Sequence, residues 1–185
     1  VVIERAVAAA ELQFLAAHDD DPFARHEAMQ QLVSGHLIAA ITGTLDADAL
    51  GEGRAGIATA LAAVLADPAL DDLMRGELLM LPGEAWLAEQ MAIADPAAIH
   101  RERQALRRFV GVTLADGFAA LHARARRVPY GLDAAARGAR KVKTQALAYL
   151  AAGDPAHGAA LAAAQYDAAD NMTDRQGALG VLASL

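Results

Sequence analysis

The feature that most constrains the fold is an Asp-Pro step that occurs four times between segments with helix-period apolar spacing. An aspartate side chain caps the free N–H groups at the start of a helix, and proline fits the first helical position because no partner is needed there for its missing N–H. Each step therefore predicts the start of a new helix. The four steps are Asp21-Pro22, Asp67-Pro68, Asp95-Pro96 and Asp154-Pro155.

Apolar residues recur at three- and four-residue intervals between these steps, as in amphipathic helices. Short connections between such helices favour antiparallel neighbours. We therefore expect an all-α fold, an irregular α-α superhelix built as a solenoid-like stack of antiparallel helices. The predicted helices cover 8–18, 22 to near Gly43, a segment around 57–65, 69–80, 83–93, 97–126, 133–151, 156–168 and 173–185, with a loop over 43–53.

The composition supports helices over sheets. Hydrophobic residues make up 55% of the chain and aromatic residues only 4%. Alanine is abundant, and it favours helices, whereas a sheet would require more β-branched and aromatic residues. The absence of cysteine excludes disulfides and thiolate metal ligands. No apolar stretch reaches the ~18 uncharged residues of a membrane span, and no signal-peptide pattern is visible, so we expect a cytoplasmic protein without a membrane partner.

Both ends of the chain predict a piece of a longer protein. The chain begins at Val1 without an initiator methionine, and it ends at Leu185 within an apolar helical pattern that has no capping residue behind it. Residues 1–7 begin with β-branched side chains, so we interpret them as the remnant of an upstream element or linker. Residues 8–185 are then a helical domain that is truncated at its C-terminal end.

Motifs that resemble catalytic sites are incomplete. His26-Glu27-Ala28-Met29-Gln30 begins like the zinc motif H-E-x-x-H, but Gln30 replaces the second zinc ligand. His100-Arg101-Glu102 has the H-x-E of zinc deaminases without their cysteine pair. Only two serines are present and no G-x-S-x-G elbow occurs, which argues against a serine hydrolase. We therefore expect no catalytic residue, no metal site and no cofactor within this chain.

Two further motifs receive structural interpretations. Gly51-Glu52-Gly53-Arg54-Ala55-Gly56 matches the dinucleotide fingerprint G-x-G-x-x-G, but no buried strand precedes it, so we interpret it as a flexible loop entering a helix. Asn171-Met172-Thr173 has the form of a glycosylation sequon. We expect Asn171 or Thr173 to cap the last helix, and Asp174 to favour the positive end of that helix.

Charge is unevenly spread along the chain. The net charge is −7, yet residues 101–143 hold 11 of the 16 basic residues and three acidic ones, so this segment is +8 and the remainder −15. A nucleic-acid surface, a face docked on an acidic neighbouring domain and a solvated helix face are the alternatives. The negative net charge and the lack of a recognition motif argue against nucleic acid. The candidate domain-facing residues are Arg101, Arg108, Arg137 and Lys141.

Several segments resemble the C-terminal helical domain of bacterial aminopeptidase N. The most specific is the stretch from Tyr166 to Asp174, which contains Asn-Met-Thr-Asp and is followed by Ala178-Leu179. Leu12-Gln13-Phe14-Leu15 and Asp21-Pro22-Phe23-Ala24-Arg25-His26-Glu27-Ala28-Met29-Gln30 are similar to the segment where that domain begins. The family usually has Trp at the position of His26. Leu79-Met80-Leu81-Pro82, Asp95-Pro96 and Ala152-Gly153-Asp154 follow in the matching order.

The resemblance implies a parent zinc-dependent aminopeptidase that releases N-terminal amino acids from peptides. The zinc and catalytic residues would belong to an upstream domain, and residues 1–7 would be the remnant of a β-sandwich or linker. The helical domain would cover the active site and gate peptide access. Its partners would be the upstream catalytic and β-sandwich domains of the same chain and peptide substrates. The alternative is a free-standing α-helical protein-interaction scaffold.

Overall fold

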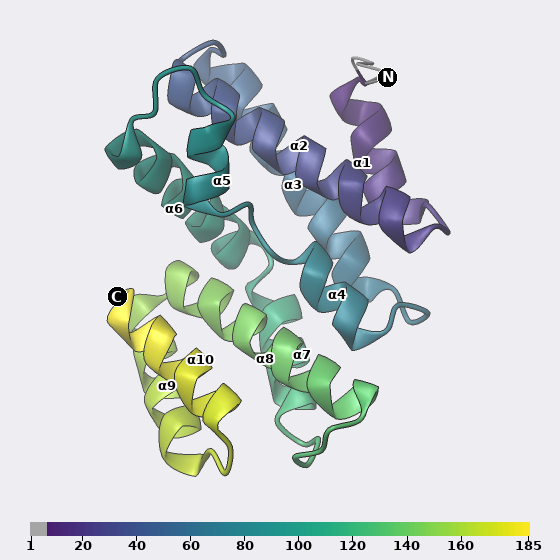
Figure 1. Cartoon of the computed structure of the whole chain (residues 1–185), viewed down its shortest axis with the longest axis vertical. Helices are drawn as coiled ribbons and strands as arrows, with labels where there is room; N and C mark the ends of the chain where they lie inside the picture. The colour runs from purple at the N-terminus through teal and green to yellow at the C-terminus, as the bar shows by residue number, and fades with distance from the viewer. Residues whose placement is uncertain (1–6) are drawn as a thin grey trace.

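The computed structural model describes residues 7–185, and within them the regular secondary structure consists of ten helices and no strand (Figure 1). This confirms the all-α class. The expected upstream remnant at 1–7 lies outside the described residues except for Val7. The helices are α1 Ala9–His18, α2 Pro22–Thr42, α3 Ala47–Ala66, α4 Asp72–Leu78, α5 Glu84–Glu89, α6 Pro96–Thr113, α7 Ala115–Ala125, α8 Ala134–Gly153, α9 Pro155–Ala168 and α10 Met172–Ala183.

Aspartate caps begin helices at three of the four Asp-Pro steps. At each of these the carboxylate accepts a hydrogen bond from a backbone N–H of the first turn, and the following proline is the first helical residue. The C-terminal end of α2 also agrees with its predicted stop, because Gly43 adopts a left-handed φ of 66°. The three confirmed caps are Asp21 before α2, Asp95 before α6 and Asp154 before α9.

The prediction that Asp67-Pro68 begins a helix is wrong. Asp67 instead ends α3, where its carboxylate accepts a hydrogen bond from Ala69 N at 2.9 Å and pairs with Arg25 at 2.9 Å. The next helix, α4, begins later, and Asp71 is its cap. A carboxylate that accepts a hydrogen bond from the N–H two residues ahead forms a turn. Asp67-Pro68 therefore forms the turn after α3 and does not begin a helix.

The expected loop over 43–53 is shorter than predicted. Asp46 caps α3 by accepting a hydrogen bond from Ala49 N at 2.9 Å, so residues 47–53 are already helical. The glycines of the G-x-G-x-x-G match therefore lie within α3, and the interpretation as a flexible loop is wrong. Three glycines in six residues concealed the start of this helix, since glycine is unfavourable in helix interiors.

The long helix predicted over 97–126 is divided into α6 and α7. Leu114 has φ −113° and ψ 25°, outside helical values, so the helix axis changes direction there. Both halves remain packed on α8. Gly111 of α6 lies against the backbone of Tyr149, and the Phe118 ring of α7 stacks on the Tyr149 ring with centroids 4.4 Å apart.

Helix α8 is the central element of the lower half of the molecule in Figure 1, where it contacts α4, α6, α7, α9 and α10. Helices α1 to α3 pack together at the other end of the molecule. One continuous apolar core joins these two regions, and it includes Met29, Leu61, Leu106 and Phe118. This arrangement of packed helices confirms the predicted superhelical stack.

A second, smaller core holds the α9–α10 hairpin on α8. It consists of five buried residues, namely Leu147, Ala151, Ala162, Ala178 and Val181. Small side chains bring these helices close together, since Gly158 of α9 lies directly against Ala151 of α8. The hairpin therefore depends on few apolar contacts, and the polar contacts described below supplement them.

One helix of the described chain, α3, is long and apolar enough to cross a membrane by length and composition, with a mean hydropathy of 1.3 over the window concerned. Core helices of water-soluble proteins meet the same criterion, so this is weak evidence for a membrane span. Ile57, Leu61 and Val64 of α3 are buried in the main core.

Candidate functional site

The residues of the incomplete zinc motif are on α2 and serve the packing of the helices. The Gln30 side chain donates a hydrogen bond to the carbonyl of Met80 at 3.1 Å, which ties α2 to the segment between α4 and α5. The Glu27 carboxylate accepts a hydrogen bond from Gln31 one turn later at 3.2 Å. Gln30 therefore links α2 to the segment after α4, and Glu27 makes a contact within α2.

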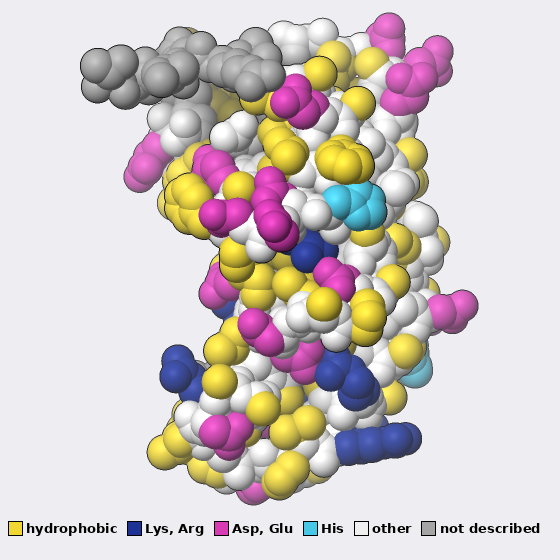
Figure 2. All heavy atoms as spheres, turned by 90° about the vertical axis from the view of Figure 1, so that its right-hand side faces the viewer, with side chains coloured by type: hydrophobic (Ala, Val, Ile, Leu, Met, Phe, Trp, Pro, Cys, Tyr) yellow, Lys and Arg dark blue, Asp and Glu magenta, His cyan; other side chains and the backbone are white. Residues whose placement is uncertain are grey.

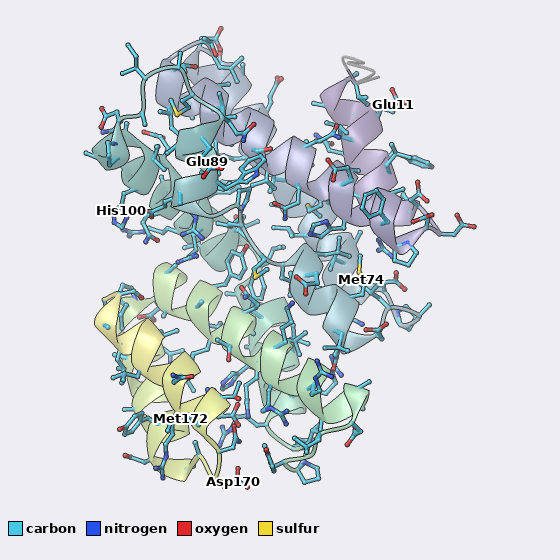
Figure 3. All side chains as sticks on the ribbon, in the orientation of Figure 1. Glu11, Met74, Glu89, His100, Asp170 and Met172 are labelled. Atoms are coloured by element: carbon cyan, nitrogen blue, oxygen red, sulfur yellow. The ribbon has the colours of Figure 1, made fainter. Side chains whose placement is uncertain are left out.

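The other two motif matches are also explained by local contacts. His100 lies at the edge of α6 (Figure 3), with its Nδ1 atom 3.0 Å from a Glu84 carboxylate oxygen, and Glu102 pairs with Arg101 and Arg54. In α3, Gly53 allows the buried imidazole of His36 to lie against the helix backbone. Gly53 of this motif therefore leaves room for the His36 side chain of α2 at the contact between α2 and α3.

The structure does not bring the four predicted basic residues together. Arg101 and Arg108 belong to α6, whereas Arg137 belongs to the first turn of α8, and these two helices meet near Gly111 at the C-terminal end of α8. Lys141 is paired with Glu77 of α4. Arg108 and Arg137 are exposed and have no ion-pair partner among the described residues, so they remain the candidates for a contact with another domain.

Much of the positive charge of residues 101–143 is balanced by the acidic remainder of the chain. Arg124 forms a bidentate pair with Asp72 at 2.7 and 2.9 Å, and Lys143 pairs with Asp174 at 2.6 Å. Burial favours a higher pKa for the Asp72 carboxyl, but the bonds from Arg124 and Arg75 outweigh it and lower the pKa. Pairs between distant segments therefore hold helices together and reduce the repulsion expected between neighbouring cations.

A buried polar cluster fixes the α9–α10 hairpin. The Asp174 carboxylate accepts hydrogen bonds from Lys143 of α8 and from Asn171, whose side-chain oxygen caps α10 by accepting from Asp174 N at 3.0 Å. The prediction that Asn171 caps the last helix is confirmed. Gln165 of α9 donates to the Asp174 carbonyl at 3.2 Å and lies 3.2 Å from the ring of His122 on α7.

A wide groove that the sequence analysis did not identify runs between the α1–α2 turn, the end of α3, α4 and the α6–α7 junction. Its volume is about 2310 Å³. Met74, labelled on α4 in Figure 3, is one of the apolar residues that line it, together with Leu65, Leu70, Val112 and Leu114. We call it the α4 groove. Its lining comes from segments that lie between Ala17 and Ala135 along the chain, so no local pattern indicates it.

The α4 groove is bordered mainly by carboxylates. Figure 2 shows the side of the molecule that lies to the right in Figure 1, with Asp and Glu side chains mostly over its upper and middle parts and Lys and Arg mostly toward its lower end. The carboxylates that line the groove are Asp19, Asp20, Asp67, Asp71, Asp72, Glu77 and Asp116, and the basic residues are Arg25, Arg75 and Arg124.

Residues 9–185 match the family described as "Domain of unknown function (DUF3458_C) ARM repeats". The chain is 36% identical over 166 residues to Aminopeptidase N of Caulobacter vibrioides, which covers 89% of this chain and 19% of that protein. It is 30% identical over 169 residues to Aminopeptidase N of Escherichia coli, covering 91% and 19% respectively. It thus spans about a fifth of the length of these relatives.

The fold also occurs in a solved structure. The crystal structure of Legionella pneumophila aminopeptidase A in complex with aspartic acid superposes with a TM-score of 0.83 at 23% sequence identity. The superposition covers 97% of this chain and 22% of that one. At this identity the likeness establishes the arrangement of helices, and it agrees with the superhelix predicted from the sequence.

Proposed function

Because this chain belongs to the DUF3458_C family of ARM-repeat helical domains and matches part of two aminopeptidases N, we propose that it covers the active site of a zinc aminopeptidase and gates the access of peptides. The parent enzyme would release N-terminal amino acids from peptides. The observation that carries the proposal is the match of nearly the whole chain to about a fifth of each relative. It favours a domain of a larger enzyme over a free-standing scaffold.

The proposal assigns zinc and the reaction to residues outside this chain. Among residues 7–185, no group of three or more His, Asp or Glu side chains lies together as a metal site requires. Gln30 and Glu27 are engaged in the packing contacts described above. These residues do not fit a catalytic zinc, so we derive no catalytic step from them. The inactivity of this chain alone and a cytoplasmic location of the parent stay predictions.

The proposed role of the chain is to restrict which peptide ends reach the catalytic centre. The helices pack around one continuous core, and densely packed interiors resist deformation. Such a domain would block the approach of large substrates without yielding to them. Upstream catalytic and β-sandwich domains would be its partners within the same chain. Short or flexible peptide termini would pass, and the same termini held on a folded protein would not.

The experiment compares three substrates of the full-length protein that share one N-terminal residue. They are an aminoacyl anilide, a flexible peptide and a folded protein that carries the same terminal sequence. We expect release from the first two and little release from the third, with a chelator abolishing all activity. Equal kcat/KM for the flexible peptide and the folded protein contradicts gating. Full activity in a metal-free preparation contradicts the zinc aminopeptidase assignment separately.

A further inference from the structure

We propose that the α4 groove is a docking site for an extended, lysine- or arginine-rich polypeptide segment supplied by a separate molecule. The groove combines three properties that suit such a segment: a concave shape, a partly apolar lining and a border on which four of the seven carboxylates have no Lys or Arg partner among the described residues. This binding site is independent of the gating role proposed above, because it requires only the described residues of this chain.

The basic residues of the α4 groove are all engaged within the protein. Arg25 donates to the carbonyls of Ala16 and Ala17 and pairs with Asp67. Arg75 donates to several carbonyls at the end of α3 and in the following loop, and to Asp72 at 3.2 Å. Two of these arginines are thus fixed by bonds to the backbone, and their charges are not available to an anionic ligand.

Arg124 is engaged in the same way, because it uses two guanidinium nitrogens on the Asp72 carboxylate. The remaining carboxylates keep their charge uncompensated. Asp19, Asp20, Asp71 and Asp116 have no Lys or Arg partner among the described residues. Three of them, Asp20, Asp71 and Asp116, are exposed. The uncompensated charge of the groove is therefore negative on three sides, at the α1–α2 turn, α4 and α7.

The apolar lining favours lysine and arginine over other cations. Leu65, Leu70 and Met74 are half-buried, and Val112 is 59% exposed. Long basic side chains bury their methylene stems along apolar surface and keep their charged ends in water. An extended segment can thus lay these stems on the lining and direct their charges to the border. A small inorganic cation gains nothing from the lining, so the combined features favour a segment with long basic side chains.

The test measures binding of a fluorescently labelled peptide of alternating Lys and Ala by the full-length protein. The peptide is acetylated at its N-terminus and amidated at its C-terminus, so it is no substrate for an aminopeptidase. We expect binding at low ionic strength that weakens steeply with added salt, and no binding of the matched Glu–Ala peptide. The triple variant Asp20→Asn/Asp71→Asn/Asp116→Asn is expected to bind about tenfold more weakly, because three nearby charges are lost.

The matched control is Asp48→Asn/Glu52→Gln/Asp167→Asn, which removes the same charge from exposed positions outside the groove. Asparagine retains the cap of α4 at position 71, and unchanged melting temperatures verify that both variants fold. Equal weakening in the two variants overturns the proposal, since net charge alone then explains binding. Absence of binding at low salt also overturns it.

Discussion

Single glycine positions show how closely these helices approach one another. A Cβ added at Gly111 would overlap the Tyr149 carbonyl and approach Gly153, which are backbone atoms that cannot rotate away. Gly35 in α2 has open space around the same position. The α6–α8 crossing therefore requires glycine, whereas the exposed position in α2 does not.

We predict opposite effects for the same substitution at these two sites. Gly111→Ala is expected to lower the free energy of unfolding by about 1–3 kcal/mol, because the helices must separate. Gly35→Ala is expected to raise it by about 0.5–1 kcal/mol through better helix propensity and a less flexible unfolded chain. Denaturant unfolding monitored by circular dichroism measures both. A stabilising effect of Gly111→Ala would contradict this prediction, because it would show that a Cβ fits between α6 and α8.

The buried His122 predicts a loss of stability in mild acid. Burial lowers its pKa below the usual 6.5, and the nearby charges of Arg126 and Lys143 act in the same direction, while the hydrogen bond with Gln165 opposes them. The unfolded chain takes up a proton as pH falls through about 6.5, but the folded chain resists it. The contribution is thus present above that pH and is lost as pH falls from there toward the lower folded pKa.

The expected slope is at most about 1.4 kcal/mol per pH unit for each such histidine. His36 is buried too, and its pKa is lowered in the same direction, first by burial and then by Arg54. The measurement is denaturant unfolding at a series of pH values between neutral and mildly acidic. His122→Gln should flatten the dependence. An unchanged slope in His122→Gln would contradict this assignment.

At the scale of elements, the α9–α10 hairpin depends on one buried ion pair. The side chains of Lys143 and Asp174 are only 10% and 8% exposed, and the apolar core beneath the hairpin is small. Lys143→Met is expected to cost about 3–5 kcal/mol, because it leaves the Asp174 charge buried without its partner. The double variant Lys143→Met/Asp174→Leu should cost less than Lys143→Met alone.

Hydrogen exchange separates a local effect from a global one in these variants. We expect amides of α9 and α10 to exchange faster in Lys143→Met while those of α2 and α3 stay protected, since the latter belong to the larger core. Uniform loss of protection over the whole chain would contradict an independent hairpin. A double variant as unstable as Lys143→Met would contradict this expectation. It would show that the ion pair stabilises the fold more than the apolar pair that replaces it.

Helix starts were predictable where a local signal had one meaning. Asp21, Asp95 and Asp154 cap helices as expected, because capping depends only on the neighbouring backbone. The Asp67 step was misassigned because its carboxylate bonds to the next turn and to Arg25, 42 residues away. The break at Leu114 has no local signal, since the apolar stripe runs through it and both of its halves pack on α8.

Charge pairing was only partly predictable for the same reason. The excess of positive charge in residues 101–143 is visible in the sequence, but its partners, such as Asp72 for Arg124, are distant along the chain. Lys141 was expected to face another domain, and the structure pairs it with Glu77. The α4 groove was missed altogether, because its border combines carboxylates from the α1–α2 turn, α4 and α7.

At the scale of the whole molecule, the exposed cations without an ion-pair partner among the described residues are the candidates for a contact with another domain. The outer surfaces of α6 and of the start of α8 carry Arg108 and Arg137, which have no partner within the described residues. An acidic neighbouring domain would stabilise either residue, and ionic strength would modulate the contact. The internally paired Lys141 provides a comparison, because its charge is already balanced.

If the chain gates the access of peptides as proposed above, Arg108→Gln/Arg137→Gln in the full-length protein is expected to change kcat/KM for longer peptides and to leave small chromogenic substrates nearly unaffected. The reason is that loss of the proposed domain contact would alter the proposed opening for longer peptides, while the catalytic residues outside this chain would stay in place. The effect should diminish at high salt, where the charges are screened. Circular dichroism should report unchanged helix content.

Lys141→Gln serves as the control. It disrupts an ion pair with Glu77 of α4, so it should lower the stability of the fold and change kcat/KM to the same extent for all substrates. Equal changes for all substrates, or none at any ionic strength, would assign Arg108 and Arg137 to a solvated face.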